Sequence, residues 1–184
     1  MVLNNPKSGR ILKQLWRFEA VGKKSIKENK NIYQICREKC DLTRQRASEE
    51  MVYISDDRIE KIESEKSLPH PDEILVMAEC YKSPELCNYF CANECPIGQK
   101  HVTELKIQEL SQIILEMIAS LNALNNEKER LIDITVDGAI SDDEVKDFKR
   151  IQGQLERISV SINGLKLWLE RAIANGEIDK NILG

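Results

Sequence analysis

Residues 42–69 read LTRQRASEEMVYISDDRIEKIESEKSLP, and this stretch predicts two short helices joined by a tight turn. Thr43 and Ser55 carry hydroxyl groups of the kind that cap helix N-termini, so we expect helices over about 44–51 and 56–63. Two acidic residues directly follow Ser55, where the dipole of the second helix favours negative charge.

Both predicted helices have few apolar residues to bury. The first would bury Ala47, Met51 and the apolar cluster at 52–54, whereas the second has only Ile59 and Ile62, three positions apart. A stripe this narrow leaves most of the second helix facing outward. We expect that outer surface to carry four carboxylates beside two basic side chains: Asp56, Asp57, Glu60 and Glu63, with Arg58 and Lys61.

The stretch resembles the helix-turn-helix of the Xre/Cro-like family of bacterial and phage DNA-binding regulators. The resemblance rests on the spacing L-T-x(15)-I-x-x-I-E, which ends at Glu63, and on Pro69 six residues later. A further predicted helix over 72–81 follows, and the resemblance covers 31–85, less than a third of the chain. The turn is one residue longer than is usual in the family, and it has Val-Tyr where the family has Gly; a glutamate likewise replaces the Gly that ends the second helix.

The resemblance implies a sequence-specific transcriptional regulator that binds DNA as a homodimer, with residues 55–61 in the major groove. The residues implied to contact DNA are Arg44, Gln45, Arg46, Ser55, Asp57, Arg58 and Lys61. The acidic outer surface leaves an alternative open, because carboxylates repel phosphate. In that alternative the module has lost DNA binding and binds another protein.

The net charge of −4 conceals an uneven distribution. Residues 1–30 hold 8 Lys/Arg and 2 Asp/Glu, whereas residues 31–85 hold 8 and 13. A nucleic acid normally binds a basic surface, so the N-terminal segment could be a basic arm along DNA phosphates. The alternatives are a short helix that covers the core and a poorly ordered extension.

Composition excludes several other classes of protein. No apolar run approaches 18 residues and no apolar signal core is present, so we expect a cytoplasmic chain without a membrane span. No arrangement of nucleophile and base and no Gly-rich phosphate loop occurs, and there are only two His, so we expect no enzymatic activity. Six cysteines in a reducing cytosol are thiols or metal ligands before they are disulfides.

Three cysteines recur every four residues and would share one helix face. They are Cys87, Cys91 and Cys95, with Cys80 or His101 as a possible fourth ligand. Converging thiolates bind zinc or an iron–sulfur cluster, which would make the cluster a metal or redox sensor. Buried or free thiols are the alternative, because cysteine also packs as a small apolar residue.

From residue 102 onward the pattern changes to long helices. Two stripes with alternating spacings of three and four predict an antiparallel coiled-coil hairpin over 102–175. The stripes are Ile107, Leu110, Ile114, Met117, Leu121, Leu124, Lys128 and Leu131, then Phe148, Ile151, Leu155, Ile158, Ile162, Leu165, Leu169 and Ala172. Val160, Leu167 and Trp168 form a further apolar side, which would pair with a second copy in a four-helix bundle or pack on the N-terminal domain.

The predicted hairpin turn also resembles a calcium loop. Oxygen-bearing side chains stand at the ligand positions, with Gly138 at the sixth: Asp133, Thr135, Asp137, Ser141 and Glu144. The same residues suit a plain helix exit and entry, with Gly138 left-handed and a capping box from Ser141 to Glu144, and this is the interpretation we favour.

The sequence therefore predicts an all-α chain in which a small helix-turn-helix domain precedes a long helical hairpin. The expected divisions are a basic arm, the helix-turn-helix domain, a Cys-rich connector, the hairpin and a tail: 1–30, 31–85, 86–101, 102–175 and 176–184.

Overall fold

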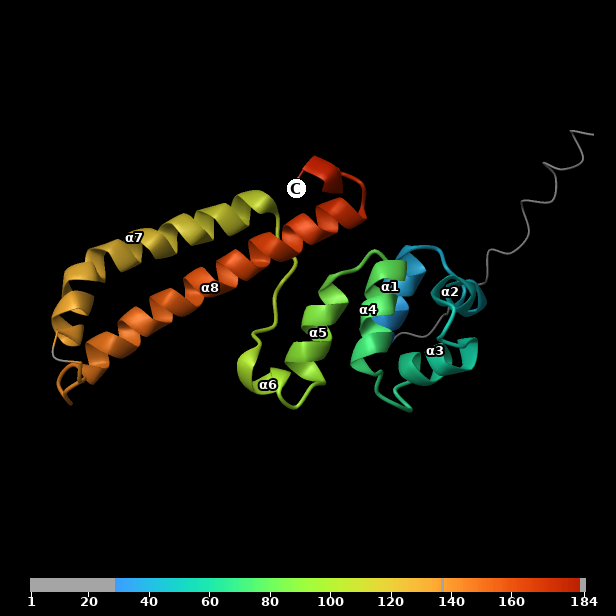
Figure 1. Ribbon diagram of the computed structural model, residues 1–184, viewed down its shortest axis with the longest axis horizontal. Coiled ribbons are helices and arrows are strands. Elements are labelled where there is room, and N and C mark those ends of the chain that lie inside the picture. Colours follow the sequence, from blue (N-terminus) through green and yellow to red (C-terminus); the bar gives the residue numbers. More distant parts are fainter. Residues whose placement is uncertain (1–28, 137, 183–184) are drawn as a thin grey trace, which may run out of the picture. The chain divides into compact units, whose positions relative to one another are not determined.

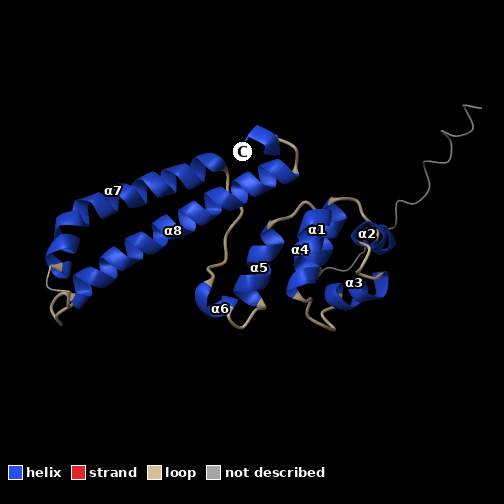
Figure 2. Ribbon diagram, viewed as in Figure 1, coloured by secondary structure: helices blue, strands red, loops and turns tan. Residues whose placement is uncertain are grey.

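The computed structural model describes residues 29–136 and 138–182. All regular secondary structure in these ranges is helical, which confirms the all-α prediction (Figure 2). The contacts divide the chain into two compact units, 1–67 and 68–184, and each is described on its own.

Three helices of eight residues form the described part of the first unit: α1 (Ile32–Lys39), α2 (Arg44–Met51) and α3 (Asp56–Glu63). Each begins at a side chain that accepts a hydrogen bond from a backbone N–H of its first turn. Asn31 Oδ1 accepts from Gln34 N at 3.0 Å, and the hydroxyls of Thr43 and Ser55 each accept at 3.2 Å. The predicted caps and the bounds of the second and third helices are confirmed.

The buried apolar side chains of the first unit come from all three helices and from the turn before α3. They are Tyr33, Cys36, Ala47, Met51, Ile54, Ile59 and Ile62. The predicted burial of the cluster at 52–54 is wrong for two of its residues, because Val52 is 80% exposed and Tyr53 83%. On α1, Ile35 is exposed, whereas Arg37 is buried.

The turn between α2 and α3 holds Val52 in a strained conformation. Its φ is 63° and its ψ is −45°, and Tyr53 N–H donates to Met51 O at 2.7 Å. This is a γ-turn whose central residue has positive φ, a rare and strained arrangement. A β-branched residue is especially disfavoured there, because positive φ suits glycine.

The second unit contains the remaining helices: α4 (Pro71–Cys80), α5 (Glu85–Asn93), α6 (Gly98–His101), α7 (Leu110–Thr135), α8 (Val145–Ala174) and the 3₁₀ helix η1 (Lys180–Ile182). α4 packs against α5, and α5 against α6. The contacts therefore group α4 with the helices that follow it, whereas we predicted that it closes a domain over 31–85. On that helix Leu75 is exposed, whereas Ile74, Met77 and Ala78 are buried.

Helices α7 and α8 lie side by side and run in opposite directions, joined by the turn over 136–144 (Figure 1). Gly138 has φ +72°, the left-handed conformation expected of it. Glu144 Oε2 accepts from the backbone N–H of Ser141 at 3.0 Å, which is the half of the predicted capping box that ties the turn to α8.

The side chains buried along α7 and α8 differ from the predicted stripes. Ile113, Ser120 and Ile134 of α7 are buried, as are Ile151 and Ser161 of α8. Leu167, expected on a separate outer side, is buried. Several residues of the predicted stripes are instead exposed, including Leu110, Leu121, Lys128, Leu155 and Ile162. Each helix carries two adjacent apolar stripes, and spacing alone does not tell which one faces the neighbouring helix.

Ion pairs join α7 and α8 close to the turn. Arg130 Nε lies 2.8 Å from Asp147 Oδ2, and Arg150 bonds both Glu127 at 2.8 Å and Asp147 at 3.0 Å. The hydrogen bond from Arg130 and the neighbouring positive charges hold the pKa of Asp147 below its usual value. These exposed pairs fix which edges of the two helices meet more than they add stability.

The backbone of Gly98 at the start of α6 lies directly against α5. A Cβ atom added there would meet the carbonyl oxygen of Cys91 and would stand 2.7 Å from its carbonyl carbon. Only glycine allows this close approach of two backbones.

We predict that Gly98→Ala destabilises the protein by about 1–3 kcal/mol, because the methyl group forces α6 away from α5. Gly153→Ala is the matched control, since a Cβ there meets nothing within 4 Å and alanine favours a helix. Chemical denaturation followed by circular dichroism measures both. Equal stability of Gly98→Ala and the parent chain would contradict the close packing.

We also predict that Val52→Gly stabilises the first unit by about 1 kcal/mol, because glycine adopts positive φ without steric cost. Tyr53→Gly serves as the comparison: it lies in the same turn, does not have positive φ and should be destabilising. The unfolding temperatures of both variants test this prediction. A lower unfolding temperature for Val52→Gly than for the parent chain would show that Val52 is not strained.

Candidate nucleic-acid interface

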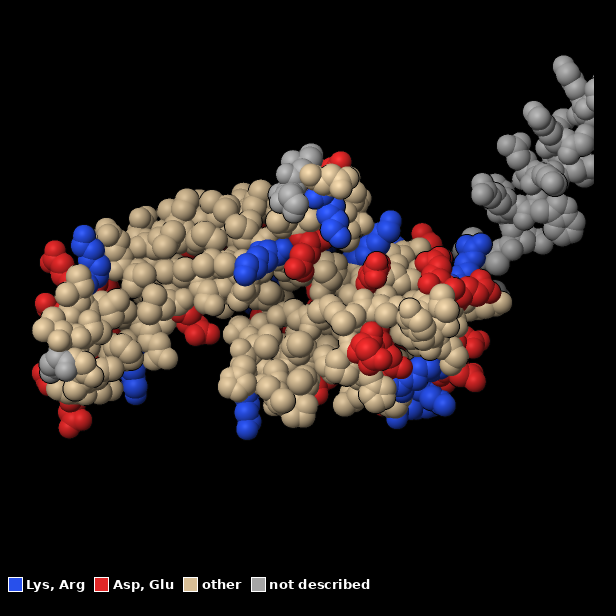
Figure 3. Space-filling view, viewed as in Figure 1, with Lys and Arg blue, Asp and Glu red and all other residues tan. Residues whose placement is uncertain are grey.

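The N-terminus of α3 is exposed and ordered by its own cap. Ser55, Asp56 and Asp57 are exposed, and the Ser55 hydroxyl accepts from the backbone N–H of Arg58. Figure 3 shows Lys and Arg side chains beside Asp and Glu in the region of α3. The surface is therefore of mixed charge and offers both donors and acceptors.

The prediction that Glu63 faces outward is wrong. Its side chain is fully buried and receives a bidentate pair of bonds from Arg37, with Nε–Oε1 at 2.5 Å and Nη2–Oε2 at 2.9 Å. Arg44 Nε adds a third bond to Oε2 at 2.7 Å. Arg37 also donates to Leu42 O, so one carboxylate joins α1, the loop after it, α2 and α3.

Burial of Glu63 changes the charge of the proposed DNA-facing surface. Glu60, the next carboxylate along α3, lies 3.0 Å from Lys66 Nζ, and the hydrogen bond from Lys66 lowers the pKa of Glu60. Of the four carboxylates expected on the outer surface, only Asp56 and Asp57 are left fully exposed, both in the first turn of α3. The acidic surface is smaller than the sequence predicted.

The implied DNA-binding residues divide into two groups. Arg44 and Arg58 have bonds within the first unit, Arg44 to Glu63 and Arg58 to Ser67 Oγ at 2.6 Å. The others are exposed on α2 and α3: Gln45, Arg46, Ser55, Asp57 and Lys61. The structure thus leaves residues of both helices exposed at the surface of the first unit.

Two residues at this surface were not predicted as functional. Val52 and Tyr53 are 80% and 83% exposed, next to the N-terminus of α3. Their apolar character suggested burial, and only the extra residue in the turn indicated that the chain bulges outward here. The basic arm predicted over 1–30 lies almost wholly outside the described residues.

The four cysteines proposed as metal ligands lie in the second unit and are all half-buried: Cys80 in α4, Cys87 and Cys91 in α5, and Cys95 after it. Within the described residues, no group of three or more His, Cys, Asp or Glu side chains is close enough together to hold a metal ion. Burial, with contributions from Cys91 and Glu170, raises the pKa of Cys87 and so favours its neutral thiol. Zinc or cluster binding stays a prediction from the sequence.

The predicted calcium ligands are in the turn between α7 and α8. Glu144 accepts bonds from both the backbone and the hydroxyl of Ser141, as in a helix entry. Thr135 Oγ1 donates to the carbonyl of Leu131. Asp137 lies outside the described residues, so the complete set of five is not placed.

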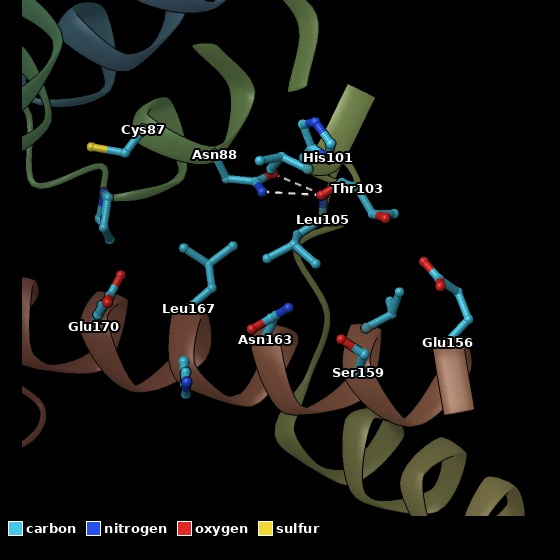
Figure 4. A pocket seen from close by; sticks show the side chains of 14 residues that line it. Cys87, Asn88, His101, Thr103, Leu105, Glu156, Ser159, Asn163, Leu167 and Glu170 are labelled. Carbon is cyan, nitrogen blue, oxygen red and sulfur yellow. Dashed lines mark hydrogen bonds between the residues drawn. The ribbon is translucent and has the colours of Figure 1, made fainter. Parts of the chain in front are cut away.

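A groove of about 510 Å³ lies between α8 and the segment that leads from α5 to α7. Asn88 holds that segment in place, because its amide bonds Thr103 O at 3.1 Å and Leu105 N–H at 2.8 Å. Figure 4 shows Asn163, Leu167 and Glu170 of α8 across from these residues. Its two carboxylates, on Glu156 and Glu170, are about 21 Å apart along α8, so they do not converge on a single ligand atom.

Comparisons with protein families, with curated proteins and with solved structures found no match to this chain. In the part of the chain that the structure covers, none of the helices combines the length and apolar character that crossing a membrane requires.

We predict that Glu63→Gln destabilises the first unit by about 3 kcal/mol, because Arg37 stays buried without its counter-charge. Glu60→Gln, on the same helix but in an exposed pair, should leave the unfolding midpoint nearly unchanged. Denaturant titration of both full-length variants tests the pair. Similar midpoints for the two would show that the buried network contributes little.

Proposed function

We propose that this protein is a sequence-specific DNA-binding regulator of transcription. In this proposal α2 and α3 form a helix-turn-helix, α3 enters the major groove, and α7 and α8 form a coiled-coil hairpin that holds a cytoplasmic homodimer. The observation that carries the proposal is the pair of capped helices, α2 and α3, fixed from the inside by Glu63 with the first turn of α3 exposed.

The exposed residues of α2 and α3 suit two kinds of DNA contact. Arg46 and Lys61 are exposed cations with the length to reach phosphates, which need only charge and reach. Ser55 and Asp57 are at the end of α3 that would face base edges, where a carboxylate accepts from the amino group of cytosine. The bonds of Glu63 to α1 and α2 hold α3 in place, and with it the side chains that α3 exposes.

A second candidate function is supported by a specific surface. Asp56 and Asp57 lie beside Val52 and Tyr53, so an acidic and an apolar patch adjoin at the start of α3. Such a surface suits a protein partner, since the aspartates repel phosphate and an exposed tyrosine is common at protein interfaces. In this case the helix-turn-helix would be an interaction module.

Selection from random duplex DNA, at low and at moderate salt, distinguishes the two functions. The proposal predicts an enriched, roughly palindromic site whose binding weakens steeply with salt. The absence of any enriched sequence at low salt would contradict DNA reading and favour the protein-interaction module.

We predict that Arg46→Ala and Lys61→Ala each weaken binding to the selected site and lower its salt slope by about 1. Lys149→Ala, an exposed cation on α8, is the charge-matched control and should change neither quantity. Fluorescence anisotropy over a series of salt concentrations gives both numbers. Unchanged salt slopes for Arg46→Ala and Lys61→Ala would show that these residues of α2 and α3 do not contact DNA phosphates.

A further inference from the structure

Helices α7 and α8 carry an exposed apolar surface in addition to the side chains that they bury against each other. Five large residues of this surface are between 36% and 49% exposed: Leu110, Ile118 and Leu121 on α7, with Leu155 and Ile162 on α8. Ile114 and Leu169 are half-buried members of the same stripes. We call these seven residues the apolar face.

The stripes of the two helices lie on the same side of the pair. On α7, Ile114 and Leu121 directly follow the buried Ile113 and Ser120; on α8, Ile162 directly follows the buried Ser161. One residue turns a helix by about 100°. Because α7 and α8 run in opposite directions, equal turns away from their shared seam bring both stripes to one side.

The ion pairs lie on the opposite side by the same geometry. Arg130 directly precedes Leu131, which is half-buried and three positions before the buried Ile134. Arg150 directly precedes the buried Ile151. These arginines bond Asp147 and Glu127. One edge of the α7–α8 seam is thus closed by charges, whereas the other is open and apolar.

The apolar face is also nearly free of charge. From residue 110 to 126, α7 has one charged residue, Glu116, and from 151 to 165 α8 has two, Glu156 and Arg157. Glu116 and Arg157 directly precede two half-buried residues, Met117 and Ile158, which are each three positions before a buried serine. The same geometry therefore places both charges on the other side. Figure 3 shows a broad uncharged stretch over α7 and α8.

We propose that a second copy of this chain covers the apolar face, so that two α7–α8 pairs form a four-helix bundle. A partner recognised by charge would need charges on the face, and a membrane-binding surface would be rimmed by Lys and Arg. A neutral face built from two antiparallel helices is self-complementary, as a two-fold interface requires. The face measures on the order of 600 Å². Two copies would therefore bury about 1,200 Å² in total, the lower end of the range for specific interfaces.

This inference deepens the proposed function, because two copies present two recognition helices, but its test needs no DNA. Analytical ultracentrifugation of the full chain over 1–100 μM is expected to give twice the mass of one chain. A monomer across this range would overturn the inference, whatever the DNA selection shows. A dimer without an enriched DNA site would leave the inference standing and remove the proposed function.

Variants then test which surface forms the dimer. Ile118→Glu with Leu155→Glu should weaken dimerisation at least about 100-fold, because carboxylates would be buried without partners. The control pair, Ala119→Glu with Gly153→Glu, places the same charges at exposed positions outside the face and should stay dimeric. Loss of the dimer in both pairs alike, or in neither, would overturn the assignment of the face.

Two further measurements distinguish a weakened dimer interface from a misfolded chain. Mixing the chain that carries Ile118→Glu and Leu155→Glu with a chain that carries Ile118→Lys and Leu155→Lys should restore a dimer, since opposite charges then face each other. Leu121→Gln keeps α7 uncharged and should weaken the dimer while circular dichroism shows unchanged helix content. Failure of the mixture to dimerise when both chains are helical would contradict the proposal.

Discussion

The first unit depends on one buried carboxylate. Glu63 has no exposed side-chain surface and receives hydrogen bonds from Arg37 of α1 and Arg44 of α2. Eight-residue helices are too short to be stable alone, so their positions must come from tertiary contacts. The small apolar core provides part of that stabilisation, and the ion pair fixes the angle at which α3 is held.

The same interaction determines which charges α3 presents. A carboxylate that would repel phosphate is neutralised inside the unit, and Glu60 is paired with Lys66 at the surface. What remains outside is a capped helix N-terminus with two aspartates, flanked by exposed cations and by the turn that holds Val52 and Tyr53. The proposed DNA reading and the alternative protein binding both depend on this small surface.

In the second unit, the two edges of the α7–α8 seam differ in charge. Charged residues close one edge of the α7–α8 seam near the turn, whereas the opposite edge remains apolar and uncharged. Arg171 and Glu85 lie 3.6 Å apart, and together with Asn88 they hold α5 and the segment after α6 beside α8. In the described residues this arrangement leaves the apolar face exposed on the hairpin.

The amino-acid sequence by itself determined the features that depend on neighbouring residues. The caps at Thr43 and Ser55, the bounds of α2 and α3, the left-handed Gly138 and the turn between two long helices all follow from local hydrogen bonding and backbone conformation. The tertiary structure alone decided that Glu63 points inward and that Leu121, Leu155 and Ile162 point outward. A glutamate becomes buried only where two arginines from other helices reach it, and one of two adjacent apolar stripes becomes the seam only when the second helix is in place.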